Sequence, residues 1–244
     1  MIEINNEKID YAVYGMKRSG HHAIINWISN HYNSFIHYNN CFIENNSIFV
    51  ANKNEVTKNG DYPYELKILS FEDRPVFEES SFDNIKKLNL NCKNILILRD
   101  AYNNYASRFV RKISPVNKQW NKIWKNYDDV DIWINYANEF IGKTNYLNSI
   151  KINYNKWFSC ENYRKELSNN FGNFTDRGLL DVLNFGGGSS FDNISFDKNA
   201  QKMNVLNRWK YFYFEKNYVE KILNNDEIKK LNYEIFNILM PKIY

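Results

Sequence analysis

The sequence predicts an α/β fold, a three-layer sandwich in which a mostly parallel central sheet lies between helices. Short apolar runs typical of strands alternate with segments whose apolar residues recur every three or four positions, as in helices. One run, Ile95–Leu98, is apolar without a break, which indicates a strand covered on both faces, as in parallel sheets. No repeat or linker divides the chain, so we expect one domain over residues 1–244.

The elements follow in order along the chain. Strands are predicted at residues 10–15, 48–50, 66–71, 95–98 and 149–154. Helices are predicted from His21 onward, where Ala23, Ile24, Trp27 and Ile28 form one apolar face, and at 102–112, 119–143 (one long helix or two), 160–169 and 215–239. Residues 39–62 are polar and weakly patterned, so apart from the short strand we expect loops there.

Composition excludes several classes of protein. Hydrophobic residues make up 43% and aromatic residues 17% of the chain, which argues against intrinsic disorder. The three Cys lack the CxxC spacing of zinc sites and are too few for a dense disulfide framework. A net charge of +4 does not indicate a nucleic-acid partner, and neither a signal peptide nor an apolar run of about 18 residues is evident. We therefore expect a cytoplasmic globular protein.

The segment Gly15-Met-Lys-Arg-Ser-Gly-His-His22, called here the 15–22 loop, lies between a predicted strand and a predicted helix. Its glycines stand five apart, as in phosphate-binding loops, where backbone N–H groups and a helix N-terminus face an anion. Lys17 and Arg18 supply cations, whereas His21 and His22 stand where a nucleoside triphosphatase has Lys and a Ser/Thr ligand for Mg²⁺. The loop thus predicts an anion site without a metal; the alternative is a plain structural turn. At a helix start both histidines are expected to be neutral N–H donors.

A second motif follows the strand at 95–98. Arg99 ends this strand and Ser107 comes eight residues later, on the predicted helix. A guanidinium at the carboxyl end of a parallel strand can bind a phosphate, and a hydroxyl can donate to the same group. The alternative is an ion pair between Arg99 and Asp100 or another nearby carboxylate.

The two motifs together resemble those of sulfotransferases that use 3′-phosphoadenosine 5′-phosphosulfate (PAPS). Arg18-Ser19-Gly20 is similar to the family's 5′-phosphosulfate loop, and the Arg99–Ser107 pair is similar to its 3′-phosphate motif. The resemblance covers roughly residues 8–112 and implies a sheet related to that of P-loop nucleoside triphosphatases, PAPS as donor substrate, no metal, and a hydroxyl acceptor such as a carbohydrate. It assigns these residues to the donor: Gly15, Lys17, Arg18, Ser19, Gly20, His21, His22, Arg99 and Ser107.

The chain departs from the family's pattern at two places. Ala101 stands where many members have Pro, and His21-His22 replace hydroxyl residues. The hydroxyl contacts to the 5′-phosphate are therefore lost or replaced by imidazole.

The chemistry needs a base for the acceptor hydroxyl and a cation near the leaving oxygen. Arg18 matches the family's leaving-group cation, with Lys17 and His21 as further catalytic candidates. Glu72 follows the strand at 66–71 in a segment similar to the base-carrying segment of some polysaccharide sulfotransferases, so it is the first candidate base, ahead of Asp73. The alternative for Glu72 is a surface acid paired with Arg74. His31 and His37, assigned to a helix end and a loop, have no supporting pattern.

The segment Phe185-Gly-Gly-Gly-Ser-Ser190 contains three glycines in a row, which indicates a mobile loop or a close approach to a ligand. Members of the family close a basic, glycine-containing loop over the nucleotide, which implies the same for this segment and assigns Arg208 to the 3′-phosphate. A simple flexible connection is the alternative.

Two other functions compete with a sulfotransferase. Asp100 after the strand at 95–98 allows a P-loop kinase or nucleoside triphosphatase, although the Gly-Lys-Ser/Thr sequence is absent. The His-His variant of the loop also allows a non-catalytic nucleotide-binding protein.

Overall fold

The computed structural model describes residues 1–4, 8–45, 47–73, 91–113, 130–182, 189, 192 and 195–239, with the side chains of 109–113 left out. Its main sheet has six strands in the order β6-β3-β7-β2-β8-β9. These strands are β2 (Tyr11–Gly15), β3 (Phe35–Tyr38), β6 (Val56–Asn59), β7 (Leu66–Glu72), β8 (Lys93–Leu98) and β9 (Ser149–Asn153). All neighbouring pairs are parallel except β3 and β6.

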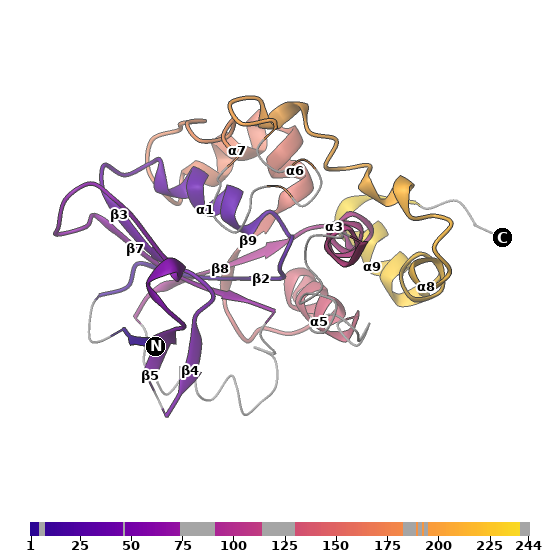
Figure 1. Cartoon of the computed structure of the whole chain (residues 1–244), viewed down its shortest axis with the longest axis horizontal. Helices are drawn as coiled ribbons and strands as arrows, with labels where there is room; N and C mark the ends of the chain where they lie inside the picture. Colours follow the sequence, from indigo (N-terminus) through magenta and orange to yellow (C-terminus); the bar gives the residue numbers. More distant parts are fainter. Residues whose placement is uncertain are drawn as a thin grey trace.

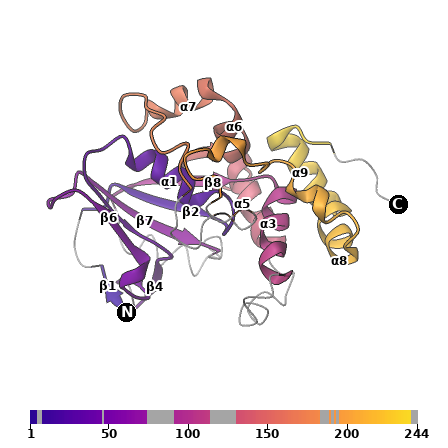
Figure 2. The same cartoon turned by 45° about the horizontal axis from the view of Figure 1, so that its top comes forward.

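Helices cover both faces of this sheet, which confirms the predicted three-layer α/β sandwich (Figure 1). On one face α1 (His21–Ser29) packs Ile24, Trp27 and Ile28 against apolar side chains of the sheet, together with α6 (Tyr154–Ser159) and α7 (Glu161–Ser168). The other face carries α3 (Ala101–Ile113), α5 (Val130–Ile141) and α9 (Asp226–Phe236). Figure 2 shows α3, α8 and α9 gathered at one end, far from the N-terminus.

The burial of the central strands explains why their sequences are continuously apolar. Every residue of β2 is buried, and the last four residues of β8 are buried as well. Strands with both faces covered need apolar residues at consecutive positions rather than at alternate ones. The unbroken run Ile95–Leu98 therefore reflects its place next to the middle of the sheet.

Several predicted boundaries were wrong. In residues 39–62 the short strand predicted at 48–50 is β5 (Ser47–Val50), but β4 (Phe42–Glu44) and β6 were not predicted. With β1 (Ile2–Glu3), β5 and β4 form a small antiparallel sheet. Strand β3 was not predicted, and His37 belongs to it rather than to a loop. These strands are two to four residues long, too short for a clear alternation of apolar and polar residues.

The C-terminal helix predicted at 215–239 is interrupted. It consists of α8 (Lys216–Tyr218), one π-helical turn η5 (Val219–Leu223) and α9, which begins after Asn225. The side chain of Asn225 accepts a hydrogen bond from Ile228 N and so caps α9 as a new helix. Of the helix predicted at 119–143, the structure describes α5; Trp120, Trp124, Arg74 and Gly186–Gly188 lie outside the described residues.

None of the described helices has the length and apolar character needed to cross a membrane.

Candidate functional site

The order of the strands brings the two predicted motifs together. Strand β2 leads into the 15–22 loop and β8 leads into Arg99, and these two strands are neighbours in which Gly15 is paired with Ile97. From β2 the chain goes to β3 on one side, whereas from β8 it goes to β9 on the other side. Such a reversal at the carboxyl ends of parallel strands is where open α/β sheets bind ligands.

The 15–22 loop is a tight turn that requires glycine at position 20. Gly20 has φ +83°, and a Cβ at this position would lie 1.9 Å from the ring of Tyr154. Gly20 is also the N-cap of α1, so the first N–H groups of that helix, which have no partner within the helix, lie at the loop. The predicted strand–loop–helix arrangement is present.

Three side chains named from the sequence meet behind this loop, and we call Arg99, Ser107 and Arg208 the arginine cluster. Both guanidinium groups donate to the Ser107 hydroxyl, Arg99 Nη1 at 3.1 Å and Arg208 Nη1 at 3.1 Å. Arg99 also donates to Arg18 O at 2.9 Å and to Val205 O, and its guanidinium lies over the Tyr154 ring. Arg99 is thus a direct link between the two motifs, although they are 81 residues apart.

Arg208 links the arginine cluster to Asp192 and Ser189. Arg208 Nη2 contacts Asp192 Oδ2 at 2.9 Å and Ser189 Oγ at 2.7 Å. Burial, together with the nearby charge of Arg99, lowers the pKa of Arg208 to about 10. Two neighbouring guanidinium groups that share one hydroxyl acceptor are suited to bind an anion such as phosphate.

Of the carboxylates suggested as partners of Arg99, Asp100 has its own donors instead. Asp100 is fully buried and accepts hydrogen bonds from Asn103 N at 2.9 Å, from Asn103 Nδ2 and from Asn155 Nδ2 at 2.9 Å. It caps α3, and both of its carboxylate oxygens are occupied by amide donors. Asp100 is therefore a structural residue rather than a free ligand for a metal.

Around the loop, several buried polar atoms find no hydrogen-bond partner in the described part of the chain. They are Ser19 Oγ, both ring nitrogens of His21, Arg99 Nε and Asn104 Oδ1. An unpaired buried polar atom costs roughly 1–3 kcal/mol, so a group of them at one place is typical of a site that a polar ligand completes. The donors among them, the Ser19 hydroxyl, the ring N–H of His21 and Arg99 Nε, fit the acceptor oxygens of a phosphate or sulfate group.

A second group lies at the end of β7, on the other side of β2, and we call Glu72, His21, His22 and His37 the Glu72 cluster. Glu72 is 6% exposed, which contradicts the reading of a surface acid, and its Oε1 lies 4.0 Å from His22 Nε2. Burial raises the pKa of Glu72 to about 7, although Lys17 and Arg18 oppose that shift. A carboxylate with a pKa close to neutral is suited to accept a proton.

The three histidines of this cluster are neutral. Burial lowers the pKa of His21 well below its usual value, that of His22 to about 4 and that of His37 to about 3. His37 Nε2 lies 2.9 Å from Ser70 Oγ, which donates to Asn39 Oδ1 at 3.1 Å. Since Ser70 donates to Asn39, it accepts from His37, and the proton of this imidazole is on Nε2.

Asp73 is not equivalent to Glu72. Its Oδ1 accepts from Arg108 Nη1 at 2.8 Å and from Lys17 N at 2.9 Å, and its Oδ2 accepts from Arg108 Nη2 at 3.3 Å. Both oxygens of this carboxylate are therefore already occupied by donors within the chain. The ion pair to Arg108 makes Glu72 the stronger candidate of the two.

Sequence reasoning missed Arg108, Asn104 and Tyr154. Arg108 and Asn104 lie four residues apart on α3, next to Ser107, and this helical spacing was the available signal. Nothing in the sequence pointed to Tyr154, the first residue of α6, which follows the edge strand β9 and contacts Gly20 and Arg99.

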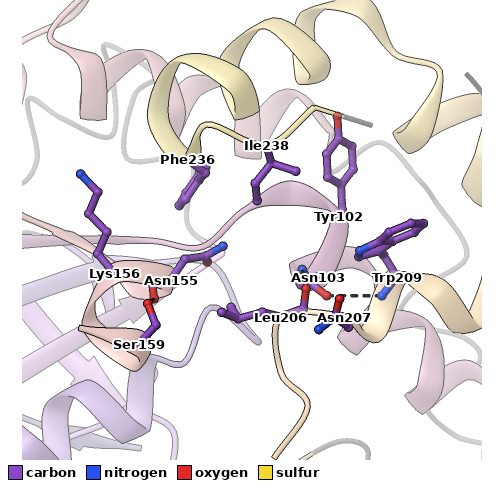
Figure 3. Close-up of a pocket in the computed structure, with 10 residues that line it drawn as sticks. All are labelled: Tyr102, Asn103, Asn155, Lys156, Ser159, Leu206, Asn207, Trp209, Phe236 and Ile238. Carbon is purple, nitrogen blue, oxygen red and sulfur yellow. Dashed lines mark hydrogen bonds between the residues drawn. The ribbon is translucent and has the colours of Figure 1, made fainter. Parts of the chain in front are cut away.

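A cavity of about 420 Å³ lies beside the arginine cluster (Figure 3). Its walls come from the start of α3, from α6, from residues 206–209 and from the end of α9. Trp209 N donates to Asn103 Oδ1 across one wall, and Leu206 lies opposite Phe236 and Ile238. The cavity shares the 206–209 segment with Arg208, but none of the predicted site residues lines it.

Comparisons with known proteins complete the description of the site. No protein-family model matches the chain, and no curated protein matches it either. Among solved structures, the fold is similar to that of mouse sulfotransferase SULT7A1 complexed with PAP, with 12% sequence identity and a TM-score of 0.49. The likeness covers 96% of this chain and 90% of that chain.

Proposed function

We propose that this chain is a sulfotransferase that transfers a sulfuryl group from PAPS to a hydroxyl acceptor, within one domain over residues 1–244. The observation that carries the proposal is the pair of adjacent anion sites joined by Arg99. One is the 15–22 loop, and the other is the arginine cluster. A nucleotide with separate 5′ and 3′ phosphate groups presents two anions, and the two sites fit such a donor.

In this proposal the donor's 5′-phosphosulfate is held by the loop residues Gly15 to His22, and its 3′-phosphate by Arg99, Ser107 and Arg208. The unpaired atoms of Ser19, His21 and Arg99 would gain acceptor oxygens on binding. The donor itself supplies the activated sulfur–oxygen bond. The guanidinium groups can bind phosphate by parallel hydrogen bonds without a metal ion.

Glu72 takes the role of general base. It accepts the proton of the acceptor hydroxyl while the acceptor oxygen forms a bond to sulfur. The bond between sulfur and the bridging phosphate oxygen breaks, and Arg18, Lys17 and neutral His21 stabilise the charge on that oxygen. Glu72 ends the reaction protonated, and its raised pKa allows this. Saccharides are the first class of hydroxyl compound to screen as acceptors.

A kinase or nucleoside triphosphatase is less well supported. Such enzymes hold Mg²⁺ with an acidic residue after a strand, and the corresponding Asp100 is occupied by Asn103 and Asn155. A non-catalytic nucleotide-binding protein would share the arginine cluster but would not need a buried carboxyl group with a pKa of about 7 beside the loop.

Binding separates these functions. We expect 3′-phosphoadenosine 5′-phosphate to raise the melting temperature without Mg²⁺ and ATP to do so less, with or without Mg²⁺. A shift with Mg-ATP alone would contradict the proposal and favour the kinase. Sulfate transfer from PAPS to any member of a saccharide and phenol panel, absent in Glu72→Gln, would then distinguish the enzyme from a binding protein.

A further inference from the structure

Asp73 and Arg108 form a buried ion pair that lies against the 15–22 loop, and nothing in the proposed reaction uses it. The side chains of Arg108 and Asp73 are 6% and 15% exposed, and two Arg108 nitrogens contact the two carboxylate oxygens. A parallel arrangement of this kind fixes both side chains in orientation.

Both members of the pair also bind the backbone of Lys17. The carboxylate of Asp73 accepts from Lys17 N at 2.9 Å, and Arg108 Nη1 donates to Lys17 O at 3.2 Å. Asn104, one turn earlier on α3, donates to the same carbonyl at 3.3 Å. The peptide groups on both sides of the Lys17 Cα are therefore held by side chains from β7 and α3.

The conformation fixed in this way is one that the chain would not readily adopt. Arg18, the next residue, has φ +71°, and Asp73 itself has φ +54°. Residues other than glycine are uncommon in this left-handed region, and surrounding contacts must hold them there. Arg18 O accepts from Arg99 and Lys17 O accepts from Arg108, so both carbonyls of the Lys17–Arg18 pair are bonded to side chains from outside the loop.

The same contacts place Glu72. Asp73 N donates to Gly15 O at 3.1 Å, which continues the pairing of β2 with β7 past Glu72. Glu72 is thus held on one side by the pairing of β2 with β7 and on the other by Asp73. It lies next to the loop that is expected to hold the donor.

We propose that Asp73 and Arg108 are positioning residues that hold the 15–22 loop in its anion-binding conformation through the backbone of Lys17. This inference rests on the proposed function, because it assumes that the loop binds the 5′-phosphate of the nucleotide. Neither side chain needs to contact the ligand for this role.

The direction in which Asp73→Asn changes the Kd for the nucleotide tests the proposal. Asp73→Asn removes a negative charge beside an anion site, so charge alone would strengthen the binding of 3′-phosphoadenosine 5′-phosphate. Loss of the contacts that hold the backbone of Lys17 would weaken this binding. We expect a Kd about 10-fold higher or more, measured by titration calorimetry. Asn tolerates a positive φ, so the backbone of residue 73 is kept.

Two further variants and a matched control complete the experiment. Arg108→Met should weaken binding as much as Asp73→Asn, the double variant little more than either one, and Arg108→Lys less. The control is Arg164–Asp176, another bidentate ion pair, with contacts of 2.8 and 2.9 Å, which joins α7 to Asp176 and has no contact with the loop. Arg164→Met and Asp176→Asn should lower the melting temperature but leave Kd within about 3-fold.

The outcomes separate the two proposals. If the wild-type protein does not bind the bisphosphate, the proposed function fails. If the wild type binds it and Asp73→Asn binds it equally or more tightly, the positioning role is wrong while the proposed function stands. If the losses of binding free energy add up in the double variant, the joint positioning role is also wrong, because the two residues would then act separately.

Discussion

The arginine cluster and the Glu72 cluster lie on opposite sides of β2 and differ in how their polar groups are satisfied. In the first, Ser107 accepts from both guanidinium groups, and Arg208 also contacts Asp192 and Ser189. In the second, burial shifts the pKa of Glu72 upward and that of three histidines downward. The hydrogen bonds of the arginine cluster are already formed, which suits binding. In the Glu72 cluster burial brings the pKa of Glu72 close to neutrality, which suits proton transfer.

The largest expected effect is on the chemistry of the Glu72 cluster. Glu72→Gln removes the base but keeps the shape of the side chain, so transfer from PAPS should fall about 10²–10⁴-fold. Because the base must be ionised, the wild-type rate should rise with pH around an apparent pKa of about 7. The measurement is a pH–rate profile with the best acceptor of the panel. A variant that keeps the wild-type rate would assign the base to another residue.

The next effect should be on binding, and it should come from the arginine cluster rather than from the Glu72 cluster. Arg99→Met removes the link between the two anion sites, so the Kd for 3′-phosphoadenosine 5′-phosphate should rise about 10–100-fold. Glu72→Gln should leave that Kd within about 3-fold. If both substitutions weaken binding equally, the two clusters are not separate in function, and the division between a binding cluster and a catalytic cluster is wrong.

The smallest effect concerns stability. The pKa of Glu72 is about 7 when folded, above its usual 4.5, so the folded state prefers the protonated group. Stability of the wild type should therefore fall as pH rises from about 4.5 to about 7. At pH 8 Glu72→Gln should be more stable by about 1–2 kcal/mol. Urea unfolding at pH 5 and pH 8 measures this difference, and an equal stability of both proteins at pH 8 would show that Glu72 is not buried as described.

The sequence was sufficient for the features that depend on short stretches of chain. The strand–loop–helix around Gly15 to Gly20 and the spacing from Arg99 to Ser107 were read from adjacent residues, and the structure brings both together. The pairing of Asp73 with Arg108 could not be predicted, since these residues are 35 apart. They meet because β7, which precedes Asp73, and β8, which precedes α3, both pair with β2.

Short polar strands were the other failure. Strand β3 has four residues, of which Ile36 and His37 are buried, so it lacks the alternation that predicts a strand. His37 was therefore set aside, although its place beside Ser70 puts it within the Glu72 cluster. Only the sheet order, which inserts β7 between β3 and β2, reveals this neighbourhood.

The order of the strands has a consequence for how such a protein could change. The proposed base comes from β7 on one flank of β2, and Arg99 comes from β8 on the other flank. Residues 35–72 can therefore diverge, or be exchanged with those of another protein, while the proposed donor site stays intact as long as Asp73 keeps its pair with Arg108. Acceptor choice and donor choice would then be inherited as separate modules of one sheet.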